Sequence, residues 1–133
     1  MSGPVSLLLE ALPGRLAICR LDATSEIPAW VFEGEFYSIS KTRDELSIVC
    51  LENVVPPDVR SERGWRRLMV QGQLDFSLTG ILSALAKPLA DKKISIFAIS
   101  TFDTDHLLVR ESQFEETCRI LKEDGHKVIG DLL

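Results

Sequence analysis

The chain has 133 residues, of which 45% are hydrophobic and 26% charged, a composition typical of a folded globular protein with one core or two small ones. Its formal net charge of -5 argues against nucleic acid as the main partner, because binding to a phosphate backbone needs clustered Lys and Arg. The cysteines Cys19, Cys50 and Cys118 lie far apart in apolar sequence, which predicts reduced thiols in a cytoplasmic protein rather than a disulfide framework or a metal site.

The N-terminal half is expected to form strands without long helices. The apolar run Val5–Leu9 is too short to span a membrane and lacks the basic residues that begin a signal peptide, so we expect no membrane partner. We interpret it as a structured arm or strand. A further strand is expected at residues 15–21 after a turn at Pro13-Gly14, and strands at residues 36–40 and 46–51 are expected to form a hairpin.

The C-terminal half follows a breakpoint at residues 53–63, where two consecutive prolines forbid a regular strand. A helix is expected from Thr79, a candidate N-cap, to about Lys93, because apolar residues recur there at helical spacing. A second helix is expected from a Ser112–Glu115 capping box to Gly125. Strands are expected at residues 65–71, 94–101, 106–110 and 127–133. This βαββαβ order predicts an α+β fold, in which an antiparallel sheet carries two helices on one face in the ferredoxin-like arrangement.

An internal repeat divides the chain into two units. Residues 39–49 can be laid over residues 99–109 without a gap, and both patterns predict a strand, a polar turn with acids and a second strand. Because the first copy lacks the signals of long helices, we interpret residues 1–63 as a degenerate copy of the unit formed by residues 64–133.

Two stretches carry a resemblance to a known family. Thr79-Gly80-Ile81-Leu82 opens the first helix of the second unit, and ISIFAISTFDTDHLLV follows that helix at residues 94–109. With these motifs, residues 65–125 resemble an ACT domain, and more narrowly the small bacterial tandem-ACT proteins related to each half of the cytosolic CASTOR arginine sensors. Residues 36–51 show a weaker likeness. The resemblance implies amino-acid binding at an interface between ACT units and a regulatory role without catalysis.

The first turn of the expected helix suits the carboxylate of a free amino acid. The N–H groups of Gly80, Ile81 and Leu82 have no intrahelical partner, and the helix dipole adds positive charge at this end. Gly80, which lacks a Cβ atom, also lets a ligand approach the backbone closely.

The turn after the following strand suits the other end of such a ligand. Asp105 offers an acceptor to an ammonium group, the main chain at Thr101 and Phe102 can complete the polar ring, and the Phe102 ring can wall a side-chain pocket. The candidate ligand-binding residues are therefore Thr79, Gly80, Ile81, Leu82, Thr101, Phe102 and Asp105.

The chain departs from the pattern of the proteins that it resembles. Many ACT domains carry proline directly before the loop glycine, where this chain has Thr79, and the arginine sensors have an acidic residue near the position of Leu78. Because leucine cannot pair with a guanidinium group, the sequence favours a neutral or apolar amino acid over arginine.

Each candidate residue also has a structural alternative. Gly80 can serve only to start the helix, Asp105 can bond only N–H groups of its turn, and Phe102 can belong to the core. His106, with no second His and no Cys nearby in sequence, is expected to be a packed or surface histidine rather than a metal ligand or a base. The spacing does not pair Cys50 with a histidine as a nucleophile, so we expect no enzyme.

The sequence therefore predicts a non-enzymatic, cytoplasmic regulatory protein that binds a free amino acid and uses neither a metal nor a cofactor. The family resemblance implies that a longer sensor holds its ligand between two such halves, so a single half is expected to form a homodimer. The alternative is a ligand-free module of the same fold that pairs with a partner protein.

Overall fold

The computed structural model describes residues 6–72 and 80–132, and its contacts group the chain into two compact units. The small unit is Gly14–Trp65, and the large unit combines Met1–Pro13 with Arg66–Leu133. Among the described residues, no helix is both long and apolar enough to cross a membrane. The division into an ACT-like domain at residues 1–63 and an ACT domain at residues 64–133 remains a prediction.

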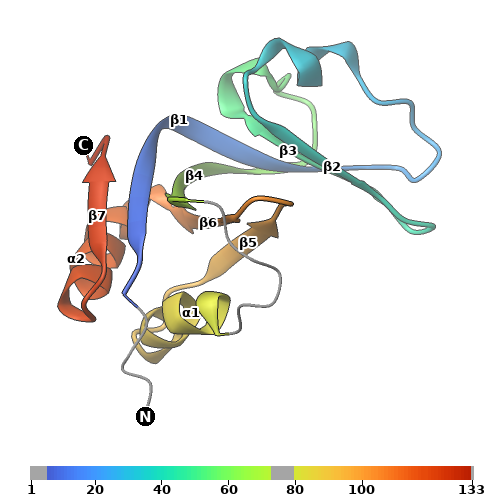
Figure 1. The fold of residues 1–133 in the computed structure, drawn as a ribbon. Coiled ribbons are helices and arrows are strands. Elements are labelled where there is room, and N and C mark those ends of the chain that lie inside the picture. Colours follow the sequence, from blue (N-terminus) through green and yellow to red (C-terminus); the bar gives the residue numbers. More distant parts are fainter. Residues whose placement is uncertain (1–5, 73–79, 133) are drawn as a thin grey trace. The chain divides into compact units, whose positions relative to one another are not determined.

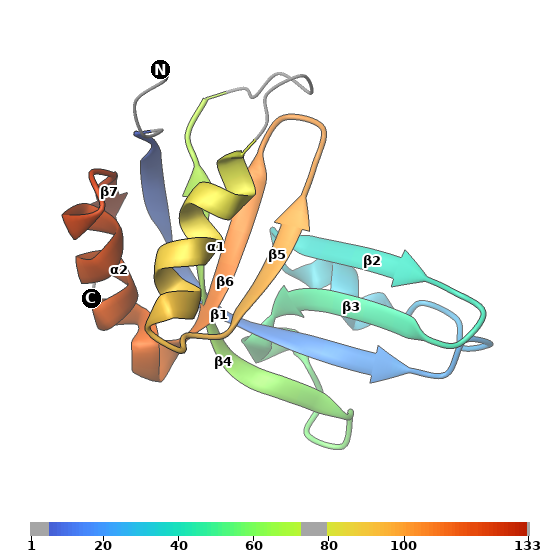
Figure 2. The ribbon, with the colours of Figure 1, turned by 90° about the horizontal axis from the view of Figure 1, so that it is seen from below.

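The large unit contains the predicted βαββαβ order. Its elements are β4 (Ser61–Val70, which begins in the small unit), α1 (Ile81–Asp91), β5 (Ile96–Ser100), β6 (Asp105–Arg110), α2 (Phe114–Glu123) and β7 (Lys127–Gly130). Figure 2 shows α1 and α2 on one face of the strands of this unit. The expected α+β fold with a ferredoxin-like arrangement is confirmed.

The first strand, β1, belongs to both units. It runs without a break from Leu8 to Leu21, so the prediction of a turn at Pro13-Gly14 was wrong (Figure 1). Gly14 adopts a φ of 90° within the strand, a conformation that glycine reaches without steric cost. In the large unit β1 pairs in parallel with β7 and is followed by β4, which gives the strand order β7–β1–β4–β6–β5. The N-terminal segment is therefore an additional strand inserted between the first and last strands of the βαββαβ unit.

The core of the large unit lies between its sheet and its two helices. Leu85 and Leu89, four residues apart on α1, are fully buried, and Leu68 and Val70 alternate with the half-exposed Met69 along β4, as the sequence predicted. The buried members of this core are Leu9, Ala11, Leu68, Val70, Leu85, Leu89, Ile94, Leu107, Val109, Phe114, Cys118, Ile120, Leu121 and Val128.

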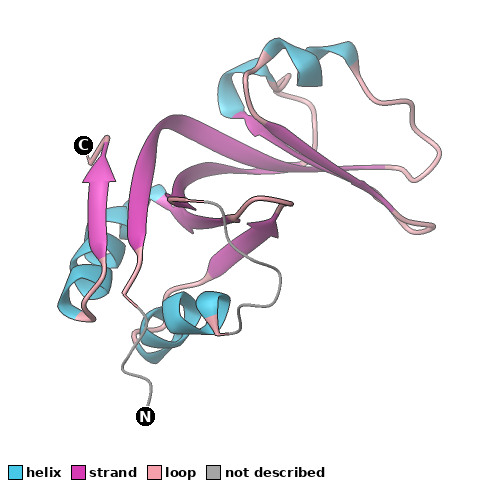
Figure 3. Cartoon of the chain, viewed as in Figure 1, coloured by secondary structure: helices cyan, strands magenta, loops and turns pink. Residues whose placement is uncertain are grey.

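The small unit has strands but no α-helix among its residues. β2 (Tyr37–Lys41) and β3 (Leu46–Leu51) form the predicted hairpin, and β3 also pairs in antiparallel fashion with the second half of β1. In chain order, two short 3-10 helices, η1 (Ala29–Glu33) and η2 (Glu52–Val54), take the places that α1 and α2 have in the large unit. Figure 3 shows both coloured as helices. The buried members of its core are Ala17, Cys19, Val31, Leu46, Ile48, Cys50 and Val55.

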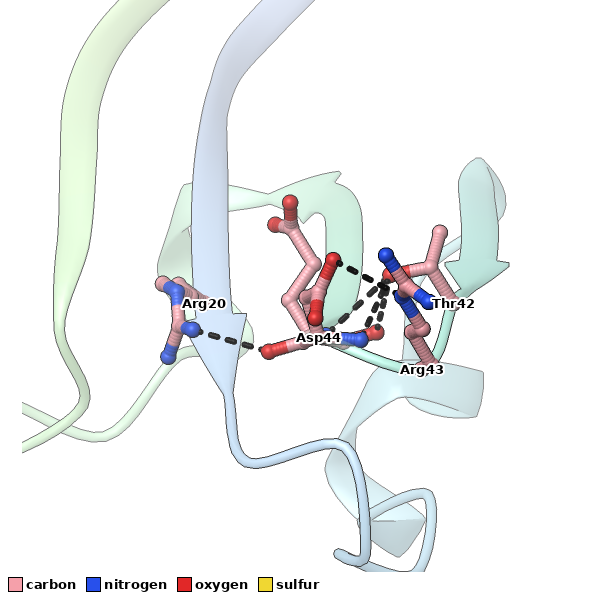
Figure 4. A network of polar contacts seen from close by, with 5 residues as sticks. Arg20, Thr42, Arg43 and Asp44 are labelled. Atoms are coloured by element: carbon pink, nitrogen blue, oxygen red, sulfur yellow. Dashed lines mark hydrogen bonds and ion pairs between the residues drawn. The ribbon is translucent and has the colours of Figure 1, made fainter.

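The hairpin turns of the two units are built alike. In the β2–β3 turn, the N–H of Thr42 donates to the carbonyl of Glu45 at 2.9 Å, and the Thr42 hydroxyl accepts from the N–H of Asp44 at 3.1 Å (Figure 4). In the β5–β6 turn, the N–H of Thr101 donates in the same way to the carbonyl of Thr104 at 2.8 Å. Thr101 lies 59 residues after Thr42, so the structural repeat is one residue out of step with the sequence overlay, which used a spacing of 60.

The starts of both α-helices differ from the sequence prediction. The N-cap of α1 is Gly80 rather than Thr79, which lies outside the described residues. A short 3-10 helix, η3 (Glu111–Gln113), precedes α2, whose N-cap is Gln113 with no side-chain cap. The predicted capping box of Ser112 and Glu115 is therefore not formed.

Candidate functional site

The first turn of α1 presents backbone donors. The earliest intrahelical bond runs from the N–H of Ala84 to the carbonyl of Gly80 at 2.9 Å. The N–H groups of Ile81, Leu82 and Ser83 therefore precede the helical ladder, as in every α-helix, and the dipole of α1 adds partial positive charge beside them. The Ser83 hydroxyl donates to the Gly80 carbonyl at 3.1 Å.

Gly80 is needed for its backbone angle. Its φ of 78° and ψ of 2° lie in the left-handed region, which residues with a Cβ atom rarely adopt. Among the described residues, a Cβ atom built on Gly80 would meet only the Ser83 hydroxyl, at 3.8 Å, so the constraint on this position is the backbone angle. The glycine thus fixes the direction in which the chain enters α1.

Asp105 is the acidic group of the predicted site. It opens β6 opposite Ser100 and shares a face of the strand with Leu107 and Val109, which belong to the core beneath the helices. Its half-buried side chain has no hydrogen bond or ion pair with another described residue. The alternative role of Asp105, bonding the N–H groups of its own turn, is therefore not seen among the described residues.

The β5–β6 turn is held by threonines. The Thr101 hydroxyl donates to the Thr104 carbonyl at 3.0 Å and accepts from the Thr104 N–H at 3.3 Å. The buried Thr104 hydroxyl donates to the carbonyl of Val70 at 2.7 Å, which ties the turn to the end of β4. Because the N–H of Thr101 is used inside the turn, Thr101 has its carbonyl rather than its amide for a ligand.

Phe102 stands out from the tip of the same turn. Its side chain is 73% exposed, so the alternative that it belongs to the core of the chain is wrong. An exposed ring three residues before Asp105 in the chain agrees with a pocket wall, which remains a prediction.

The two predicted corners lie at the same end of the large unit. Figure 2 shows the first turn of α1 and the β5–β6 connection at this end, with the helix in the layer that covers the sheet. Gly80, Ile81 and Leu82 come from the helix, while Thr101, Phe102 and Asp105 come from the hairpin. Together they offer amide donors for a carboxylate and a carboxylate for an ammonium group.

A groove of about 350 Å³ starts at Gly80 and runs along α1, with Asp124 at the end of α2 also in its lining. Its lining residues are Gly80, Ser83, Ala84, Lys87, Pro88, Asp91 and Asp124. Lys87 and Asp91 form an exposed ion pair at 3.3 Å within it. Apart from Gly80, none of these residues was predicted from the sequence, although the polar face of the amphipathic helix was a signal that could have identified them.

His106 is packed against an arginine. Nη1 of Arg67 lies 3.2 Å from Nδ1 of His106, so the arginine donates to a neutral ring. Burial lowers the pKa of His106 below its ordinary value, and the charge of Arg67 lowers it further, while Asp105 opposes both. Among the described residues, no group of three His, Cys, Asp or Glu side chains could hold a metal ion.

The three cysteines are free and buried. The interaction between the two thiols lowers the pKa of Cys19 and, together with burial, raises that of Cys50. Burial raises the pKa of Cys118. The partner of Cys50 is thus another thiol, which gives no support to a nucleophile paired with a histidine.

Comparison with protein-family models gives two matches. The model described as an ACT domain matches residues 60–123. A second model, described as an N-terminal domain, matches residues 14–58.

Curated relatives match part of the chain. The cytosolic arginine sensor for mTORC1 subunit 1 is 41% identical over 64 residues in Bos taurus and 37% identical over 86 residues in Mus musculus. These matches cover 46% and 59% of this chain, but the chain spans only 20% and 26% of those sensors.

Solved structures match nearly the whole chain. A crystal structure of a protein from Agrobacterium tumefaciens aligns with a TM-score of 0.90 and 44% identity, over 96% of this chain and 95% of that one. The ligand-free regulatory subunit of aspartate kinase from Thermus thermophilus aligns with a TM-score of 0.59 over 87% and 93% of the two chains. At 8% identity, the second likeness concerns the fold alone.

Proposed function

Because the chain belongs to the ACT domain family, we propose that it is a non-enzymatic regulatory protein that binds a free amino acid. The observation that carries this proposal is the common location of the α1 amides and the β5–β6 turn with Asp105 at one end of the large unit. A cytoplasmic location, expected from the three reduced thiols, is part of the proposal.

The proposed site binds the carboxylate and the ammonium group of a zwitterionic amino acid. The ligand carboxylate accepts from N–H groups of Ile81 and Leu82, where the helix dipole also favours negative charge. The ligand ammonium donates to Asp105 and to the carbonyl of Thr101, and Phe102 contacts the ligand side chain. Thr79, which directly precedes Gly80, completes the set of candidate ligand-binding residues.

A second copy of the chain completes the proposed site. Gly80, Thr101 and Phe102 are all exposed, so a single chain leaves the ligand open to water on one side. The related arginine sensors are about four to five times as long as the stretch of them that this chain spans. We therefore propose a homodimer in which two copies enclose the ligand.

The proposed ligand is neutral or apolar. Leu78 lies outside the described residues, but its aliphatic side chain offers no charge to a guanidinium group. An amino acid with an uncharged side chain leaves no buried cation unpaired, whereas an unpaired buried charge costs several kcal/mol, on the order of 3–5.

A binding screen tests the proposal. Isothermal titration calorimetry of the full chain with each proteinogenic amino acid should find a neutral or apolar ligand that also raises the unfolding temperature. Asp105→Asn should weaken that binding about tenfold or more, since it removes a charge-assisted hydrogen bond while keeping the size of the side chain.

Asp44→Asn is the matched control, because Asp44 lies in the corresponding turn of the small unit and is exposed. It should leave the affinity unchanged. The proposal is wrong if no amino acid binds at millimolar concentration, or if both variants bind the ligand as tightly as the unaltered chain.

A further inference from the structure

Two exposed aromatic side chains pair on the small unit. Phe32 is 52% exposed and Tyr37 is 44% exposed, and their rings lie edge to face with centroids 5.1 Å apart and planes at 84°. The neighbouring Val31 is fully buried in the core of this unit, to which neither ring belongs. The core of the small unit is thus closed without these rings.

The ring pair lies at the start of an open strand edge. Tyr37 is the first residue of β2, and β2 pairs with β3 as the terminal strand in the order of the sheet. No other described strand pairs with its second edge. An open edge of this kind can accept an extended peptide as an added strand.

The chain around the ring pair is acidic. The stretch from Asp22 to Tyr37 contains four acidic residues and no Lys or Arg, so it accounts for most of the net charge of -5. The acidic residues are Asp22, Glu26, Glu33 and Glu35, and all four are exposed. Glu33 and Glu35 lie between Phe32 and Tyr37 in sequence.

We propose that Phe32, Tyr37 and the open edge of β2, here called the aromatic edge, dock a basic segment of a partner protein. The segment is extended, adds to β2 as a strand, and carries an apolar or aromatic anchor flanked by Lys or Arg. This goes beyond amino-acid binding, since the aromatic edge belongs to the small unit and the proposed ligand site to the large one.

Three properties of the aromatic edge fix the chemistry of its partner. Backbone pairing with β2 supplies affinity that does not depend on partner sequence. Phe32 and Tyr37 supply the large, rigid contact area that dominates binding energy at interfaces. The acidic residues favour positive charge in the partner, speed its association at low salt and disfavour an acidic segment or an anionic surface.

A selection from random peptides tests this pairing. Phage-displayed short peptides are selected on the immobilised full chain, and the enriched peptides are synthesised and measured by isothermal titration calorimetry. The expected peptides combine an apolar or aromatic residue with flanking Lys or Arg, and their affinity falls as the salt concentration rises.

Variants locate the binding surface. Phe32→Ala and Tyr37→Ala should each weaken peptide binding about tenfold or more. The double variant Glu33→Lys, Glu35→Lys should also weaken peptide binding, and the loss of affinity should be larger at low salt than at high salt. Ile129→Ala is the matched control, because Ile129 is also a large apolar residue, 47% exposed, but lies on β7 of the large unit.

Circular dichroism and the unfolding midpoint should be nearly unchanged in Phe32→Ala, because its ring lies outside the core. The proposal is overturned if no peptide is enriched, if the enriched peptides lack basic residues, or if Phe32→Ala and Tyr37→Ala bind them normally. It is also overturned if Phe32→Ala abolishes self-association in sedimentation equilibrium, since the aromatic edge would then be an interface between two copies.

Discussion

At the scale of single residues, the left-handed conformation of Gly80 directs the first amides of α1. A residue with a Cβ atom is strained at a φ of 78°, although its Cβ would be in ordinary contact with the described residues around it. Gly80→Ala should lower the free energy of unfolding by about 1–2 kcal/mol. Gly80→Asn should cost less, because asparagine tolerates this conformation. Equal losses in chemical denaturation for the two variants would contradict this explanation.

His106 links stability to pH. Its pKa in the folded protein lies below the ordinary value of 6.5, so the unfolded chain takes up the proton first as the pH falls. The free energy of unfolding should therefore decrease as the pH drops through about 6.5 and stop decreasing, for this group, below the folded pKa. His106→Gln, which keeps an acceptor for Arg67, should flatten this part of the profile measured by urea denaturation.

Substitution of Arg67 gives a second test of the contact between Arg67 and His106. Arg67→Gln removes the cationic cause of the lowered pKa but leaves the ring largely buried. An NMR titration of the imidazole should then show the pKa of His106 moved upward, toward its ordinary value. An unchanged pKa would mean that burial alone is responsible.

At the scale of elements, the first turn of α2 contains a buried side-chain hydrogen bond and no capping box. The Thr117 hydroxyl is fully buried and donates to the carbonyl of Gln113 at 2.7 Å. Thr117→Val should lower the free energy of unfolding by about 1 kcal/mol, whereas Ser112→Ala should change it by less than about 0.5 kcal/mol. Thermal denaturation of both variants checks this order, and a larger loss in Ser112→Ala would restore the role of the capping box.

Sequence patterns predicted the elements of the large unit better than their ends. The apolar stripe of α1 and the alternation of β4 depend on local spacing, and both are observed. The path of β1 was not predictable in the same way, because its partner β7 lies far along the chain and periodicity carries no information on pairing. The repeat was misaligned by one residue because the overlay matched the apolar strand residues at a spacing of 60, although both turns carry Thr-x-Asp at a spacing of 59, in Thr42–Asp44 and Thr101–Asp103.

In the candidate site, too, features that depend on local sequence were predicted, and features that depend on contacts between distant residues were not. Sequence alone selected Gly80 and Asp105 because a helix start and a strand turn have local signals. It did not show that the amide of Thr101 is consumed inside its turn, or that Phe102 stands outside the core. It also missed Lys87 and Asp124, which line one groove only because of the way α1 and α2 pack.

At the scale of the whole molecule, the proposed site couples ligand binding to assembly. A ligand held between two copies favours the dimer, and binding to the folded form alone adds RT ln(1 + [L]/Kd), about 2.7 kcal/mol at a hundredfold excess over Kd. Sedimentation velocity should therefore show a larger dimer fraction when the amino acid identified by calorimetry is added. Asp105→Asn should lose this shift, and a ligand that binds tightly without changing the dimer fraction would place the site within one chain.

The course of β1 also has a consequence for synthesis on the ribosome. Residues 14–65 emerge close together in time, so the strands of the small unit can pair while the rest of the chain is still being translated. The apolar segment that begins β1 must wait for β7, its parallel partner near the other end of the sequence. During that interval Leu8 and Leu9 lack this pairing in the nascent chain, and such a segment is the kind of surface that chaperones at the tunnel exit protect.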